Sequence, residues 1–379
     1  MERIVVSRKR GGGGGARRGL QRLATMVLLA GVAACESTTT SPPGLVELDT
    51  EAALADYETL ARVLSTQGFA GFLALEGRTP FGERAGVSAV AGLDPRAGDS
   101  PRGFALRLME TLRQADASSG GPAAAPLLSG QFLGKTFVYD PALDEYVVDP
   151  DRTGAPANGV RFILYEVDAQ ERPRAGTEIG YADLLDEGAG SAADVKLRWV
   201  AVESGTTVLD YRTSVDESNG DGRITVDGFV VDDSARLDFS VDVRGRRSGG
   251  KEILDMDFDL RVDSREFRVT GEVRGMEEGD GKGSGSVVVA VKHQAHSLRL
   301  ELDGTPGTVN GSIAVDGDLF ATITGDPEDP DVKGASGEPV TAEEAMVVLA
   351  VVQIVDDVFT LVEDLVEPVH NLLALGWIL

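Results

Sequence analysis

Oxygen-bearing side chains recur at every second position in one short polar segment. Glu217, Asn219 and Asp221 alternate with small residues, and Gly222 follows the last of them. Calcium takes about six to eight oxygen ligands, and a loop that supplies them from alternate positions needs a glycine where the backbone turns sharply. These three residues are therefore candidate calcium ligands.

The same segment resembles the first part of the calcium loop of EF-hand and dockerin proteins. Two departures count against the resemblance. The first ligand is Glu217 where an Asp is expected, and the twelfth position is Gly228 where a bidentate Glu is expected. The flanking residues also alternate between apolar and polar, as strands do. The alternative is an ordinary hairpin turn, which needs no metal ion.

Three aspartates, Asp255, Asp257 and Asp259, alternate with apolar residues and so share one face of a predicted strand. Neighbours on that face lie about 6.6 Å apart, which is too far for three carboxylates to hold one ion unaided. Arginines on nearby predicted strands are the expected partners: Arg236, Arg244, Arg261 and Arg268. The pattern predicts a solvated outer face crossed by ion pairs.

The composition argues against several other chemistries. One Cys in 379 residues forbids internal disulfides and Cys-rich zinc modules. A formal net charge of −26 disfavours nucleic-acid binding. No Ser lies in a Gly-x-Ser-x-Gly sequence, and Gly130–Thr136 has the wrong glycine spacing for a phosphate loop. We therefore expect no enzyme and no cofactor beyond the candidate calcium; an unrecognised hydrolase is the remaining catalytic alternative.

The first 34 residues have the composition of an export signal. A basic stretch precedes an apolar stretch, Leu23–Ala34, that is too short for a permanent membrane span. It ends in Val32-Ala33-Ala34-Cys35, which resembles the lipobox of bacterial lipoproteins. That resemblance implies cleavage before Cys35, a diacylglycerol on its sulfur and an acyl chain such as palmitate on its amine. The alternatives are a secretory signal with a chance Cys and, from Arg17-Arg18, twin-arginine export.

The resemblance to lipoproteins also implies a place in the cell. Acyl chains on Cys35 would anchor the protein in a membrane of the cell envelope. Glu36 stands where inner-membrane retention usually requires Asp, which favours the outer membrane, facing the periplasm or the surface. Residues 35–48 have the polar composition of a flexible tether. Removing residues 1–34 takes away seven basic residues and one acidic residue, so the net charge becomes −32.

Residues 49–379 are expected to form one domain that begins with helices. Apolar residues recur at helical spacing from Glu51 to Thr66 and again from Phe104 to Ala115, within a helical region at 51–116. Gly68 is expected to end the first of these helices.

From 131 to 325 the apolar period changes from 3.6 residues to two. The stretches 235–244 and 254–263 alternate strictly, and turn-forming clusters separate most of the similar stretches. About ten strands with short connections predict a large, curved antiparallel meander with one dry face and one wet face.

The dry face needs a cover, and the C-terminal segment is the natural one. Residues 341–375 are mostly aliphatic, with acidic residues confined to a narrow stripe, which predicts a long helix buried on most of its circumference. The predicted fold class is therefore α+β, in which the meander packs against the N-terminal helices and this long apolar helix.

Two functions of different classes follow. In the first, the lipid-anchored protein holds an apolar ligand, such as a lipid, in a groove between the sheet and the helices. The candidate groove residues are Phe239, Met256, Phe258, Leu260, Val352 and Phe359. This architecture is similar to that of periplasmic lipoprotein carriers and lipid-binding lipoproteins, although the same residues would equally form a packed core without ligand space. The alternative is a structural or adhesive surface module that binds a protein partner or calcium through its acidic face.

Overall fold

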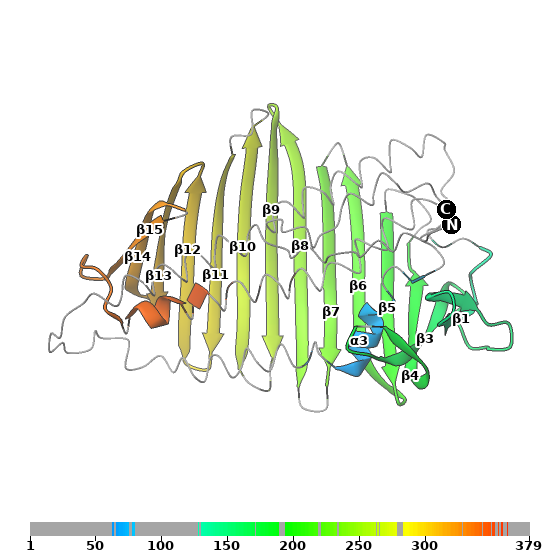
Figure 1. Cartoon of the computed structure of the whole chain (residues 1–379). Coiled ribbons are helices and arrows are strands. Elements are labelled where there is room, and N and C mark those ends of the chain that lie inside the picture. Colours follow the sequence, from blue (N-terminus) through cyan, green and yellow to red (C-terminus); the bar gives the residue numbers. More distant parts are fainter. Residues whose placement is uncertain are drawn as a thin grey trace, which may run out of the picture.

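A computed structural model of the chain describes residues 130–352 apart from short gaps. It also describes Val355, Val358 and Val362 and, before the sheet, Val63, Leu128 and most of 66–79. Within these residues the fold is dominated by one very wide β-sheet (Figure 1).

The sheet contains fifteen strands. They are β1 (Thr136–Asp140), β2 (Glu145–Val148), β3 (Gly159–Val167), β4 (Pro173–Asp186), β5 (Asp194–Glu203), β6 (Thr206–Ser218), β7 (Asp221–Val231), β8 (Arg236–Ser248), β9 (Lys251–Val262), β10 (Phe267–Glu278), β11 (Gly283–His293), β12 (His296–Thr305), β13 (Thr308–Val315), β14 (Asp318–Asp326) and β15 (Asp329–Gly334).

From β3 to β15 every strand pairs antiparallel with the next one in the chain. The order changes only at the other edge, where β1 pairs parallel with β3 and antiparallel with β2. Short connections leave two sequential strands no geometry other than the hairpin, which explains the consecutive order. Register shifts in the β3–β4, β5–β6 and β13–β14 pairs add local bends, because a bulge increases strand twist.

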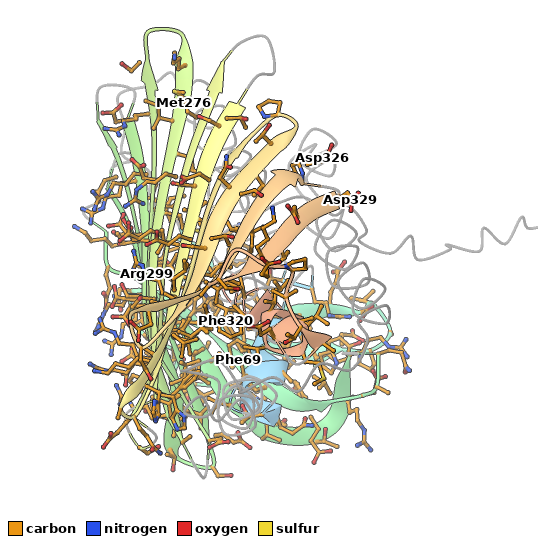
Figure 2. All side chains as sticks on the ribbon, turned by 90° about the vertical axis from the view of Figure 1, so that its left-hand side faces the viewer. Phe69, Met276, Arg299, Phe320, Asp326 and Asp329 are labelled. Carbon is orange, nitrogen blue, oxygen red and sulfur yellow. The ribbon has the colours of Figure 1, made fainter. Side chains whose placement is uncertain are left out.

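The two faces of the sheet differ in polarity because successive side chains of a strand point to opposite sides. In β9, Leu254, Met256, Phe258 and Leu260 are buried, whereas the aspartates between them are only half-buried. We call the apolar side the inner face and the charged side the outer face. Figure 2 shows Arg299 on the outer side, with Phe69 and Phe320 on the inner side.

The predicted α+β fold class is wrong. The described residues form a nearly all-β structure in which the helical parts are α3 (Gln67–Leu73), residues 344–349 and a few described positions beside gaps, and they contain no long apolar helix corresponding to 341–375. The apolar spacing of that segment does report burial, since Val348, Val351, Val355 and Val358 are buried members of the core. Apolar periodicity identifies which residues are buried, but it does not fix the length of a helix.

Helix α3 lies on the inner face, where it contacts β3, β4, β5 and β6 (Figure 1). Thr66 caps its N-terminus by accepting a hydrogen bond from the amide of Phe69. Gly68, expected to end a helix, lies inside this one instead. A Cβ on Gly68 would come within 2.6 Å of Glu203 Oε2 and 3.1 Å of Val208 Cγ2, so the glycine permits close packing of helix on sheet. The expected helix at Phe104–Ala115 lies outside the described residues.

Candidate functional site

The structure gathers most of the predicted groove residues in one place. Phe239 pairs with Leu260 across β8 and β9, and Val241 pairs with Phe258 one row further along. Phe239, Met256, Phe258, Leu260 and Val352 are each at most 5% exposed and belong to the same buried cluster, whereas Phe359 lies outside the described residues. These side chains form part of the core, and whether a ligand can enter between them remains a prediction.

Two of the candidate calcium ligands, Glu217 and Asp221, lie where β6 and β7 adjoin at their hairpin. The antiparallel ladder pairs Glu217 with Gly222 and Ser218 with Asp221, which leaves two residues for the connection, the length of the commonest hairpin loop. Asn219 lies outside the described residues, as does the lipidation residue Cys35, so both predictions stand as made. Within the described part of the chain, no group of three His, Cys, Asp or Glu side chains is arranged to hold a metal ion.

The outer face carries ion pairs, as the sequence predicted, but most partners of the β9 aspartates differ from the expected arginines. Arg268 pairs with Asp259 as expected, whereas Arg246 pairs with Asp255 and Arg274 with Asp257. Arg236 and Arg244 instead pair with aspartates of their own strand, β8. Arg198 of β5 donates through Nε and Nη2 to the two carboxylate oxygens of Asp210 in β6, at 2.8 and 2.6 Å. Arg161 holds Asp183 in the same way at 2.7 Å for each bond. Further pairs on this face are Arg223–Asp242, Arg244–Asp242, Arg236–Asp238, Arg246–Asp255, Arg268–Asp259 and Arg274–Asp257. The three aspartates of β9 therefore pair with arginines rather than bind a shared metal ion.

These pairs change the titration of their carboxylates. The hydrogen bonds from Arg198 lower the pKa of Asp210, against a smaller opposing effect of burial. Burial alone would raise the pKa of Asp242, but the hydrogen bonds from Arg223 and Arg244 outweigh it and lower that pKa. Both carboxylates are consequently held in the ionised form, and the outer face remains a lattice of paired charges at neutral pH.

Aromatic side chains concentrate on the inner face at the β1–β6 end, beneath α3. Phe72 of α3 meets Trp199 of β5 edge-on, with ring centroids 5.2 Å apart, and also contacts Tyr211 of β6 at 6.3 Å. Phe162 of β3 joins Trp199, at 5.9 Å, to Tyr146 of β2, at 5.6 Å. We call these five residues the aromatic cluster. Such edge-to-face contacts each stabilise the core by about 1 kcal/mol beyond the burial of their area.

Two polar atoms of the aromatic cluster have no hydrogen-bond partner among the residues that the structure describes: the Tyr146 hydroxyl and Trp199 Nε1. Their residues are 1% and 3% exposed, so water does not reach them from the surface. Burial raises the pKa of Tyr146, which keeps its hydroxyl protonated and able to donate. A buried donor without an acceptor costs roughly 1–3 kcal/mol, and such atoms are uncommon in folded proteins. The cluster therefore presents two free donors to any acceptor that enters it.

Sequence reasoning did not nominate the aromatic cluster. A usable signal was present, because five of the six tyrosines and Trp199 lie between 139 and 211. That concentration marks an aromatic part of the core, but only the structure shows which of the polar atoms remain unpaired.

No helix in the described part of the chain is long and apolar enough to cross a bilayer. The chain matches no protein-family model, and neither a curated protein nor a solved structure shows significant similarity to it.

Proposed function

We propose that the protein is a lipid-anchored component of the bacterial cell envelope that binds an amphipathic ligand between its sheet and α3. The lipobox-like sequence ending in Cys35 supports the anchor. The observation that carries the ligand is the pair of unpartnered donors, Tyr146 Oη and Trp199 Nε1, inside the aromatic cluster. The apolar part of the ligand would lie against the rings, and oxygen acceptors on it would receive hydrogen bonds from these donors.

The surroundings of the cluster favour a neutral acceptor. Arg78 is the cation that acts electrostatically on Tyr146, but its Nε already contacts Asp144 Oδ1 at 3.0 Å. A carboxylate or phosphate buried beside the rings would lack a free counter-charge, and an unpaired buried charge is very costly. The ligand class is therefore an apolar molecule with an ester, amide, ether or hydroxyl oxygen.

Entry of a ligand requires movement of α3. Phe72 covers the edge of Trp199 and touches Tyr211, so a ligand that reaches Trp199 takes the place of the Phe72 ring. Helix α3 has only seven residues, and a helix this short depends on its packing rather than on its own stability. We expect Phe72→Ala to raise the rate of ligand entry while weakening the packing of α3.

Native mass spectrometry of the full chain, extracted in mild detergent, tests the ligand proposal. We expect the wild type to carry a non-covalent ligand, seen as mass beyond that of the protein and its covalent lipid. Tyr146→Phe should bind the extracted ligand about five- to tenfold more weakly, the effect of one lost hydrogen bond. Tyr181→Phe is the matched control, because Tyr181 lies on β4 under the guanidinium of Arg161 and away from the aromatic cluster. An empty wild type, or equal affinity of Tyr146→Phe and wild type, would refute the proposal.

The anchor has a separate test. Cells fed labelled palmitate should label the wild-type protein but not the Cys35→Ala variant, because lipidation of this class needs the Cys thiol. Equal labelling of both proteins, or labelling of neither, would remove the anchor from the proposal without affecting the ligand experiment.

A further inference from the structure

A cavity lies on the outer face, far along the sheet from the aromatic cluster. It has a volume of about 360 Å³ and spans β9 to β13 at the end of these strands where Met276 lies (Figure 2). Its volume is near the lower limit of small-molecule sites, which begin at about 300 Å³.

The residue types along β10 to β12 explain why the surface is hollow here. Gly275, Gly285 and Gly304 pair with one another across three adjacent strands. They alternate with the outer-face residues, so the side chains they lack would lie on the inner face and only their backbone borders the cavity. The central strand, β11, contributes only Ser284 and Ser286 to the outer face at this point. Longer side chains on the flanking strands then rise on either side of the two serines.

On the β9–β10 side of the cavity, the charged side chains already have ion-pair partners. Arg274 Nη2 contacts Asp257 Oδ1 at 2.9 Å, and Arg274 Nε lies 3.5 Å from Asp255 Oδ1. Asp255 also receives Arg246 at 3.2 Å. The guanidinium of Arg274 is thus neutralised by its own sheet and offers little attraction to an anion.

On the β11–β13 side, the polar side chains have no such partners within the described residues. The side chains of Ser284, Ser286, Asp303, Thr305 and Asn310 line the cavity and make no hydrogen bond or ion pair within the described residues. Together they offer hydroxyl, amide and carboxylate groups that both donate and accept. Ile253 and Met276 add an apolar surface to the opposite side.

We propose that this cavity binds a neutral saccharide. A sugar carries hydroxyl groups that match the free donors and acceptors and a C–H face that fits against Ile253 and Met276. An anion is disfavoured by Asp303 and by the net charge of −26. A cation would meet only one carboxylate without an ion pair, that of Asp303, and no group of three acidic, His or Cys side chains in the described residues is arranged to hold a metal ion. The cavity lining contains no aromatic ring, so we expect weak binding, with a Kd of about 1 mM.

Saturation-transfer NMR of the full chain tests the proposal, with neutral hexoses, N-acetylhexosamines and their disaccharides as ligands and with sugar phosphates and alkylamines as charged comparison compounds. We expect transfer from the wild type to at least one of these sugars. Ser286→Leu fills the cavity and should reduce that transfer at least fivefold. Ala290→Leu, on the same strand and the same face but outside the cavity, is the matched control and should leave transfer unchanged.

Three results would overturn the proposal: no transfer to any neutral sugar, equal transfer with Ser286→Leu, or transfer to sugar phosphates and alkylamines alone. This experiment does not depend on the amphipathic ligand of the aromatic cluster, because Tyr146→Phe should leave sugar binding unchanged.

Discussion

At the scale of single residues, the packing of the inner face depends on where side chains are missing as much as on where they are large. Gly271 of β10 pairs directly with Phe258 of β9. A Cβ on Gly271 would come within 2.0 Å of Phe258 Cζ, so the phenyl ring lies over the glycine. Phe258 is buried and cannot move aside without disturbing its neighbours.

We expect Gly271→Ala to lower the free energy of unfolding by about 1–3 kcal/mol, because the new methyl group overpacks the core. Chemical denaturation measures the change. Gly304→Ala is the control: its Cβ would meet no atom closer than 3.9 Å, and we expect a change within about 0.5 kcal/mol. The explanation fails if the two variants are equally stable, or if Phe258→Leu does not rescue Gly271→Ala.

A second prediction at the scale of residues concerns how the ion pair between Arg198 and Asp210 makes the free energy of unfolding depend on pH. Since the pKa of Asp210 is lowered in the folded protein, the pair stabilises the fold above the ordinary Asp pKa of about 3.9. That stability is lost as the pH falls through the lowered pKa. Asp210→Asn should therefore reduce the free energy of unfolding by about 1 kcal/mol at pH 7, and by progressively less as the pH falls below 4.

Urea denaturation at pH 7, 5 and 3 measures this dependence. Asp303→Asn serves as the control, because Asp303 makes no ion pair within the described residues and its replacement should have little effect at any of the three values. If the free energies of unfolding of Asp210→Asn and the wild type differed by the same amount at all three pH values, the ion pair with Arg198 would not be the cause of that difference.

At the scale of elements, the sequence predicts strands well where one face is dry and the other wet. The alternation at 235–244 and 254–263 falls within β8 and β9, which have apolar and charged faces. The first half of β4 does not follow a strict alternation, because three successive residues after the buried Pro173, residues 174–176, are exposed. The acidic, proline-containing segment Asp329-Pro330-Asp331 shows no apolar alternation, yet it begins β15, which is held by backbone pairing with β14.

The position of α3 and the aromatic cluster were harder to predict from the sequence. Gly68 usually signals a helix end, but here it is required for the approach of α3 to Glu203 and Val208. In the same way, the free donors of Tyr146 and Trp199 are a property of the packed structure. Patterns along the chain identify inward-facing residues, but they do not indicate which polar atoms find a partner among distant strands.

At the scale of the whole molecule, a sheet this wide has two edges that must not recruit other chains. At one edge, β15 is short and carries Pro330, Asp329, Asp331 and Lys333, features that discourage further strand pairing. At the other edge, the amide of Tyr146 in β2 donates to the carbonyl of Arg78 at 2.7 Å, so a segment following α3 occupies part of the free side.

Stability should fall from the middle of the sheet towards the β15 edge. Five residues of β8 are buried on the inner face, Gly245 and the apolar Leu237, Phe239, Val241 and Val243, whereas β15 buries only Gly334 among its described residues. Strands with few buried contacts open locally at low cost. We expect amide hydrogens of β14 and β15 to exchange before those of β6 to β9, measured by mass spectrometry of peptides. Simultaneous exchange of all strands would contradict this gradient.

The consecutive strand order has a consequence for how such a chain can change over generations. Because each strand from β3 onward is hydrogen-bonded to its successor, losing two adjacent strands, such as β11 and β12, would bring β10 beside β13 with their directions still opposed. Duplicating two strands would likewise preserve the alternation. The width of the sheet can therefore evolve in steps of one hairpin, while the aromatic end beneath α3 keeps its own geometry.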